Sequence, residues 1–153
     1  HEEAGVELVE KFLKRLTNEQ KLIKYVLNMC SLHMKPNTYA RDKSSVKATN
    51  KLFDKSIDAE GLIYLSLSDT LGKIPRTPID DSESFLKKRL KIYREYMSRP
   101  YVTGKELCEC GIVCKENFKH YLALSHDFRI KGVDKEEALR QILSEAKRKN
   151  DLK

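Results

Sequence analysis

The sequence predicts an all-α protein, and three observations support that prediction. Apolar residues recur at three- and four-residue spacing through most of the chain, as they do on the buried face of an amphipathic helix. Capping residues or glycines stand at the ends of these segments. No stretch shows the alternating pattern of a half-buried strand. We therefore expect about eight helices in one or two packed bundles and no sheet.

Length and composition are those of a globular protein. The 153 residues are 40% hydrophobic and 35% charged, which suits one domain or two small ones. No apolar run approaches the ~20 residues of a membrane-spanning helix and no signal peptide is recognisable, so we expect a cytoplasmic protein without a membrane partner. The net charge of +7 fits a nucleic-acid partner, although many soluble proteins share it. Because the first residue is not methionine, we expect a fragment or a processed protein.

The first half of the chain predicts four helices. A Thr17-Asn18 break separates the first two, a polar loop at residues 35–42 follows the second, and Asp58 is expected to cap the fourth. The four segments cover residues 2–16, about 19–33, 43–55 and 59–71.

Two polar residues fall on apolar helix faces in this half. His33 ends an apolar stripe, and Asp69 shares a face with Leu62 and Leu65. A buried acid needs a hydrogen-bonding partner, an opposite charge or a metal. Two interpretations stay open: a satisfied core histidine with an aspartate that caps a neighbouring helix, or a pair of metal or phosphate ligands.

The segment Gly72–Ile79 contains two prolines and is the predicted domain joint. It divides the chain into domains at residues 1–74 and 80–153. The second domain is expected to hold a long helix from Asp80 to about Ser98, a helix pair within residues 101–132, and a final helix that Asp134 begins.

The long helix carries the most basic stretch of the chain. Seven basic residues and one acid lie between Phe85 and Lys105. At about 100° per residue, the charges gather opposite a broad apolar side, except for Arg89, which falls within the apolar arc and is expected to snorkel or to pair with a buried acid. A solvated face explains these charges without a ligand, whereas a phosphate-binding face explains why they are so one-sided. The residues on the charged side are Lys87, Lys88, Lys91 and Arg94.

The helix pair in residues 101–132 is organised by Thr103, Gly111 and Gly132, which are expected to cap the first helix, break it and end the second. Such a pair suits phosphate binding or plain packing equally well. Three cysteines in a CxCxxxC pattern lie within it, near His120, and zinc binding is conceivable. Because a CxC on a helix points its sulfur atoms apart, we expect reduced thiols. These cysteines are Cys108, Cys110 and Cys114.

Several kinds of catalytic site are missing from the sequence. It has no P-loop, no GxGxxG and no nucleophile elbow. A nucleotidyl-transferring site needs clustered carboxylates that hold two metal ions on a sheet, and no strand is predicted. If the chain belongs to a polymerase, its catalytic part lies elsewhere in the protein.

Several motifs resemble bacterial tRNA nucleotidyltransferases (CCA-adding enzymes) and the related poly(A) polymerases. HEEAG, CSLHMKP and DAEGLIYLSLSDTLGK are similar to the second half of the HD-type helical domain of that family. The tail from Tyr101, YVTGKELCECGIVCKENFKHYLALSHDFRIKGVDKEEALRQIL, is similar to the end of many of these enzymes. Each motif alone is weak, but their order and spacing cover nearly the whole chain.

The resemblance implies that this chain holds RNA by shape and phosphate contacts, while an N-terminal head outside it performs the transfer with Mg²⁺. The chain itself then has no catalytic residue and no cofactor of its own, and its partners are tRNA or other RNA and the head. The choice between CCA addition, A addition and poly(A) synthesis belongs to the head. The expected phosphate contacts are Lys87, Lys88, Lys91, Arg94, Arg99, Lys105, Lys115 and Lys119.

The resemblance also has two departures. His1, His33 and Asp69 match later ligands of the HD metal-binding pattern, but its earlier His and its His-Asp doublet are not in this chain, so a divalent metal would be held poorly. The Pro-Gly turn of the family is Cys114-Lys115 here, and we expect the charge of Lys115 to take the place of an amide contact. Two alternatives stay open: a fragment of an HD-type metal-dependent phosphohydrolase, and a non-catalytic helical module that docks the head or forms a homodimer.

Overall fold

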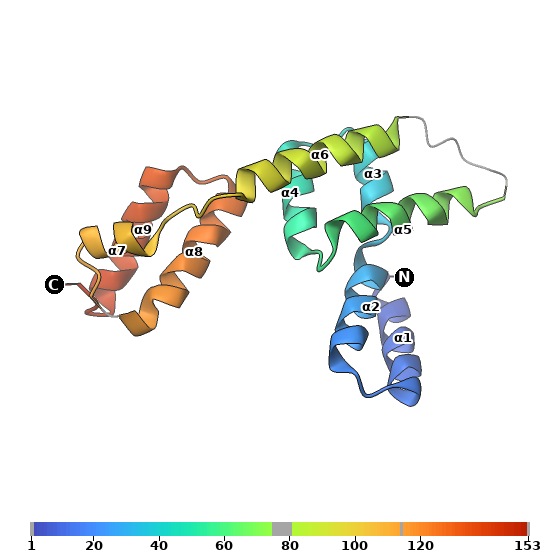
Figure 1. Ribbon diagram of the computed structural model, residues 1–153, viewed down its shortest axis with the longest axis horizontal. Coiled ribbons are helices and arrows are strands. Elements are labelled where there is room, and N and C mark those ends of the chain that lie inside the picture. The colour runs from blue at the N-terminus through green and yellow to red at the C-terminus, as the bar shows by residue number, and fades with distance from the viewer. Residues whose placement is uncertain (1, 75–80, 114, 153) are drawn as a thin grey trace. The chain divides into compact units, whose positions relative to one another are not determined.

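The computed structural model describes residues 2–74, 81–113 and 115–152, and within these ranges it is all-α (Figure 1). Nine α-helices and one short 3₁₀ helix make up the described secondary structure, and the β contact among them is a single bridge between Ile112 and Leu152. The prediction of an all-α fold is therefore confirmed. The chain divides into two compact units, His1–Tyr93 and Arg94–Lys153.

None of the helices in the described ranges combines the length and the apolar character that crossing a membrane requires.

The first unit is built around α5 and its neighbours. α1 packs on α2, while α3 packs on both α4 and α5. One core cluster joins Met29 and Leu32 of α2 to Leu52 and Leu62, and a second surrounds Phe53. The helices are α1 (Glu2–Leu16), α2 (Gln20–Leu32), α3 (Lys35–Arg41), α4 (Val46–Lys55), α5 (Ala59–Leu71) and the greater part of α6 (Ser82–Met97).

The prediction of a polar loop at residues 35–42 was wrong, because Lys35–Arg41 forms α3. Pro36 stands in the first turn of this helix, where the missing N–H costs nothing and the fixed φ angle favours the helix. Pro36 and Ala40 are buried, and the Asn37 amide donates to the carbonyl oxygen of Ser66 at 2.5 Å. The helix is therefore held by packing against α5 as well as by its own turns.

The expected cap of α5 is confirmed. Asp58 precedes the helix, and its Oδ1 accepts a hydrogen bond from the Gly61 amide at 2.8 Å. Asn28 of α2 braces the preceding turn, donating to the Lys55 carbonyl and accepting from the Ile57 amide, each at 2.9 Å. These bonds fix the entry to α5 against α2.

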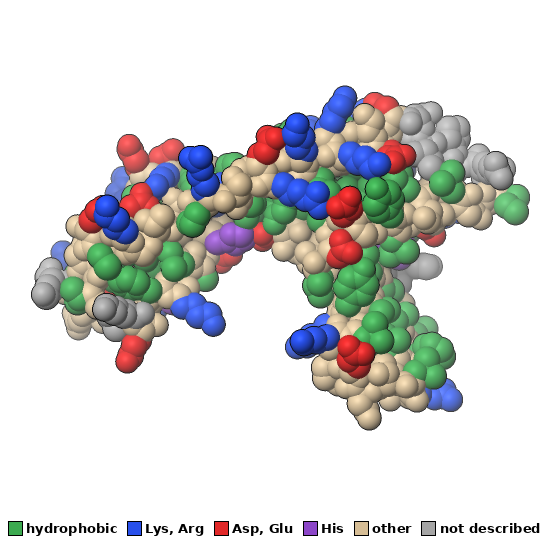
Figure 2. All heavy atoms as spheres, in the orientation of Figure 1, with side chains coloured by type: hydrophobic (Ala, Val, Ile, Leu, Met, Phe, Trp, Pro, Cys, Tyr) green, Lys and Arg blue, Asp and Glu red, His purple; other side chains and the backbone are tan. Residues whose placement is uncertain are grey.

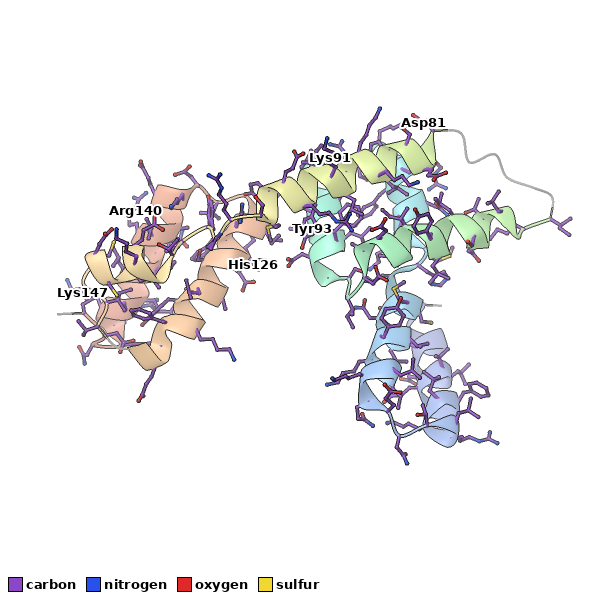
Figure 3. The ribbon with its side chains drawn as sticks, in the orientation of Figure 1. Asp81, Lys91, Tyr93, His126, Arg140 and Lys147 are labelled. Atoms are coloured by element: carbon purple, nitrogen blue, oxygen red, sulfur yellow. The ribbon has the colours of Figure 1, made fainter. Side chains whose placement is uncertain are left out.

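α6 begins beyond the predicted joint but contributes to the first unit. Leu86 and Leu90 are buried in one cluster with Phe53 and Ile63. Tyr93 reaches α4, where its hydroxyl donates to Asp54 at 3.2 Å (Figure 3). Most of the predicted domain joint, residues 75–79, lies outside the described residues.

The second unit has its own core beneath α7, α8 and α9. Val102, Leu107, Ile112 and Tyr121 are buried there together with residues of α9. Its elements are α7 (Gly104–Glu109), a 3₁₀ helix (Lys115–Asn117), α8 (Phe118–Lys131) and α9 (Lys135–Arg148).

The expected helix ends in this unit are confirmed. Thr103 and Glu106 form a full capping box at the start of α7, and Asp134 accepts from the Glu136 amide at the start of α9. Gly111 follows α7 with φ 89°, and Gly132 ends α8 with φ 74°. Both values lie in the left-handed region, which glycine enters without strain.

Glu106 makes the second unit sensitive to acid. Its hydrogen bond from the Lys135 ammonium at 2.5 Å, followed by those from Thr103, lowers the pKa of Glu106 from 4.5 to about 2. Because the folded state binds this proton less tightly, the stabilisation is fully present above about pH 4.5 and is lost as the pH falls towards 2.

We therefore expect Glu106→Gln to reduce the loss of stability of the second unit between pH 4.5 and pH 2. Thermal unfolding followed by circular dichroism across this range measures it. Glu116→Gln, at an exposed position, is the matched control. Parallel pH profiles for wild type and Glu106→Gln would contradict the prediction.

Candidate nucleic-acid interface

α6 presents the predicted basic face. Leu86 and Leu90 are buried one turn apart, so one side of the helix packs on the first unit and the opposite side is left to solvent. Lys88, Lys91 and Arg94 follow one another at three-residue spacing, and all three are exposed. Figure 2 shows lysine and arginine side chains along this helix, with acidic side chains beside them. Positive groups spaced along one helix face are suited to a row of phosphates.

The first turn of α6 is less basic than the sequence indicated. Lys87 Nζ lies 2.6 Å from Glu83 and 5.4 Å from the centre of the Tyr64 ring, and the hydrogen bond to Glu83 raises the pKa of Lys87. Asp81, next to the start of α6, lies 2.7 Å from Lys43, which lowers the pKa of Asp81 (Figure 3). The acids therefore balance the lysines here, and the positive face is strongest from Lys88 onwards.

Among the described residues Arg89 is paired with no acid, so the expectation of a buried acidic partner is not met there. Its Nη2 donates to the Ser44 carbonyl at 3.1 Å, and its guanidinium stacks over Phe85 at 4.9 Å. Arg89 therefore ties α6 to the turn between α3 and α4. A backbone carbonyl is enough to satisfy it because the side chain is only partly buried.

The remaining predicted phosphate contacts lie in the second unit. Arg99, Lys105 and Lys119 are exposed, and Lys105 lies 3.7 Å from Glu109. Lys115 begins the 3₁₀ helix, but its side chain lies outside what the structure describes. The turn in which Lys115 was expected to contact a phosphate therefore stays a prediction.

Sequence reasoning missed Arg129 of α8. Its guanidinium lies 4.2 Å from the centre of the Tyr96 ring and 5.3 Å from that of Tyr101, and its Nη1 donates to the Arg99 carbonyl at 2.6 Å. This stack fixes the segment after α6 on α8 and so positions the backbone of Arg99. Arg129 lies about 30 residues from its partners along the chain, so no spacing rule of the sequence indicates that they are in contact.

The predicted metal ligands are not brought into a cluster. His33 Nδ1 lies 2.7 Å from the Cys30 carbonyl, and Asp69 forms an ion pair with Lys73 at 2.9 Å. Asp69 is partly exposed, and its described partner is on its own chain segment rather than at a neighbouring helix end. Within the described ranges no group of three or more His, Cys, Asp or Glu residues is placed to hold a metal. His1 lies outside those ranges, so an HD site with His1 stays a prediction.

The cysteines also form no metal-binding cluster within the described residues. Cys108 and Cys110 are free thiols on the exposed end of α7, and Cys30 is a partly buried free thiol. Cys114 lies outside the described residues. The described thiols form no disulfide with one another, and the reduced state of the whole set stays a prediction.

No family model matches this chain, and comparisons with curated proteins and with solved structures give no match either.

Proposed function

We propose that this chain is the RNA-holding helical part of a tRNA nucleotidyltransferase of the CCA-adding or poly(A)-polymerase type. The observation that carries the proposal is the exposed row of Lys88, Lys91 and Arg94 on α6. The order of the family-like motifs and the all-α fold support it. Nucleotide transfer, with its Mg²⁺, is assigned to a head outside this chain.

Binding would follow from charge and shape. Each lysine or arginine that contacts a phosphate releases a condensed counterion, which favours association at low salt. The wide minor groove of an RNA helix offers phosphates and 2′-hydroxyls to a protein surface, and a rigid helix such as α6 needs no sequence code to contact them. The buried Leu86 and Leu90 hold α6 in place, so little ordering is required when RNA binds.

Titration of fluorescent tRNA with the 153-residue chain tests the proposal. With about three phosphate contacts, raising salt from 50 to 200 mM should weaken binding roughly 20- to 40-fold, since each contact contributes a slope of about −0.7 to −0.9. An unstructured RNA of equal length should bind less tightly. Absence of binding at low salt, or affinity that salt does not change, would exclude this function.

A further inference from the structure

α1 exposes a row of large apolar side chains. Leu8, Phe12 and Leu16 follow one another at four-residue spacing and are 68%, 58% and 66% exposed. The opposite side of the helix, with the partly buried Val6 and Leu13, serves the contact between α1 and α2. A soluble protein seldom leaves three neighbouring side chains of this size in water unless another surface covers them.

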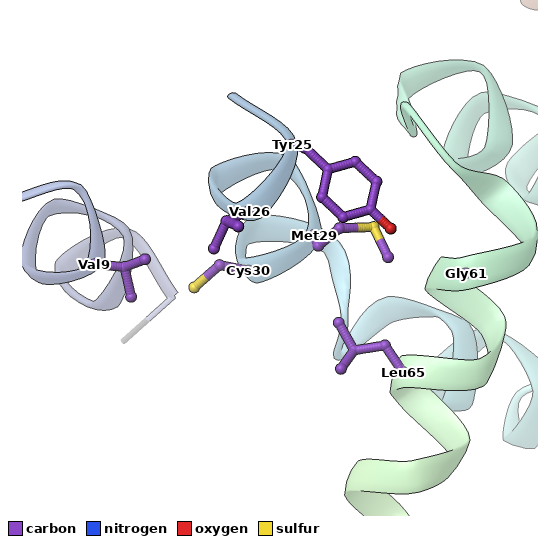
Figure 4. A pocket seen from close by; sticks show the side chains of 7 residues that line it. All are labelled: Val9, Tyr25, Val26, Met29, Cys30, Gly61 and Leu65. Carbon is purple, nitrogen blue, oxygen red and sulfur yellow. The ribbon is translucent and has the colours of Figure 1, made fainter. Parts of the chain in front are cut away.

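The same unit also contains a groove. Val9, next to Leu8 in sequence, lines a cavity of about 410 Å³ between α2 and α5 (Figure 4). The other lining residues are Tyr25, Val26, Met29, Cys30, Gly61 and Leu65. The groove is a second mainly apolar surface of the same unit, and α1 contributes Val9 to it.

A charged row lies beside the apolar row. Glu7, Lys11 and Arg15 also have four-residue spacing, one position earlier, and all three are exposed. None of them forms an ion pair with a residue in the described part of the chain. The row is negative at Glu7 and positive at Lys11 and Arg15, so its sign reverses along the helix.

We propose that this surface binds a second copy of the chain, with the two α1 helices antiparallel about a two-fold axis near Lys11 and Phe12. Glu7 and Arg15 each lie four residues, about 6 Å, from Lys11. In the antiparallel arrangement Glu7 of each copy therefore lies level with Arg15 of the other. The two Lys11 side chains also come close at the axis, but the two Glu7–Arg15 pairs outnumber this one like-charge contact. In a parallel pair related by a two-fold axis the charged rows would lie on opposite sides of the interface and could not pair, so the charges favour the antiparallel arrangement.

The same axis also pairs the apolar rows. Leu8 of each copy lies near Leu16 of the other, and the Phe12 side chains meet near the axis, as a self-complementary two-fold interface requires. One helix pair buries less than the ~1,200 Å² of a standard interface. The dimer is therefore weak and depends on concentration. This inference is independent of the RNA-binding proposal, since it uses none of the residues of the α6 face.

Sedimentation velocity of the 153-residue chain tests the dimer over roughly 5 to 500 μM, a range chosen for a weak interface. The weight-average sedimentation coefficient should rise from that of a monomer towards that of a dimer. Phe12→Ser should abolish the rise while leaving the helical circular dichroism unchanged, because Phe12 is mostly exposed in the monomer.

Charge-swapped variants test the orientation. Glu7→Lys makes the charged row wholly positive, and the double variant Lys11→Glu with Arg15→Glu makes it wholly negative. Each variant alone should stay monomeric, and an equimolar mixture should dimerise at least as well as the wild type. The proposal would be overturned if the wild type stayed monomeric at every concentration, or if the folded variants did not associate when mixed. The apolar face of α1 would then bind a different partner.

Discussion

Replacing Lys88, Lys91 and Arg94 together by glutamate should weaken tRNA binding by at least about 100-fold at 50 mM salt. Each substitution removes a phosphate contact and adds a repulsive charge to a face that is exposed along α6. The slope of log affinity against log salt should become shallower by about 2 to 3, because three released counterions are lost. Fluorescence anisotropy of labelled tRNA at four or five salt concentrations measures both quantities.

The matched control is a triple variant with the same change in net charge, from +7 to +1, elsewhere on the first unit. Lys21, Lys24 and Lys47 suit this purpose because they are exposed and lie on α2 and α4. Glutamate at these positions should weaken binding much less, since long-range attraction alone is screened within about 10 Å at 0.1 M salt. If both variants lost tRNA affinity equally, binding would depend on the net charge of the chain and not on the α6 face. If the α6 variant kept its full affinity for tRNA, the proposed interface would be refuted.

Asp151→Ala should destabilise the second unit by about 2 to 4 kcal/mol. Asp151 is 7% exposed, and its Oδ2 accepts hydrogen bonds from the Tyr121 hydroxyl and from the Asn117 amide, the latter at 2.8 Å. Tyr121 is fully buried in the core of the unit. The alanine would leave the Tyr121 hydroxyl without this acceptor in a place that excludes water, which accounts for most of the expected cost.

Urea denaturation gives the overall change, and peptide-resolved hydrogen exchange locates it. Protection should fall in α8 and α9 and stay unchanged in α2 and α5, which belong to the first unit. Asp127→Ala, at an exposed position of α8, is the control and should change stability by less than about 0.5 kcal/mol. A similarly small change for Asp151→Ala would show that the buried carboxylate adds little.

What the sequence predicted well depends on residues that are close together along the chain. Asp58, Thr103 and Asp134 were expected as helix caps, and each is one, because capping joins residues two or three positions apart. The ion pair of Lys87 with Glu83 has four-residue spacing and was likewise open to prediction. The sequence did not predict α3 because a proline is as typical of a loop as of the first turn of a helix, where Pro36 lies.

The features that the sequence did not predict join distant residues. The Arg129 stack, the bond from Arg89 to Ser44 and the Asp151 hydrogen bonds span about 30 to 45 positions. No spacing rule reaches that far, since such contacts depend on how helices pack. The exposure of the α6 lysines followed from periodicity, whereas the balance of charge at its first turn needed the positions of Tyr64 and Lys43.

The bridge between Ile112 and Leu152 has a consequence for synthesis on the ribosome. The Val113 amide donates to the Asp151 carbonyl at 3.0 Å, so the turn after α7 is closed by residues made about 40 positions later. During vectorial synthesis the second unit therefore cannot complete its core until residue 152 has left the exit tunnel. The first unit ends at Tyr93 and has no such requirement, so its helices can pack while the second unit is still being translated.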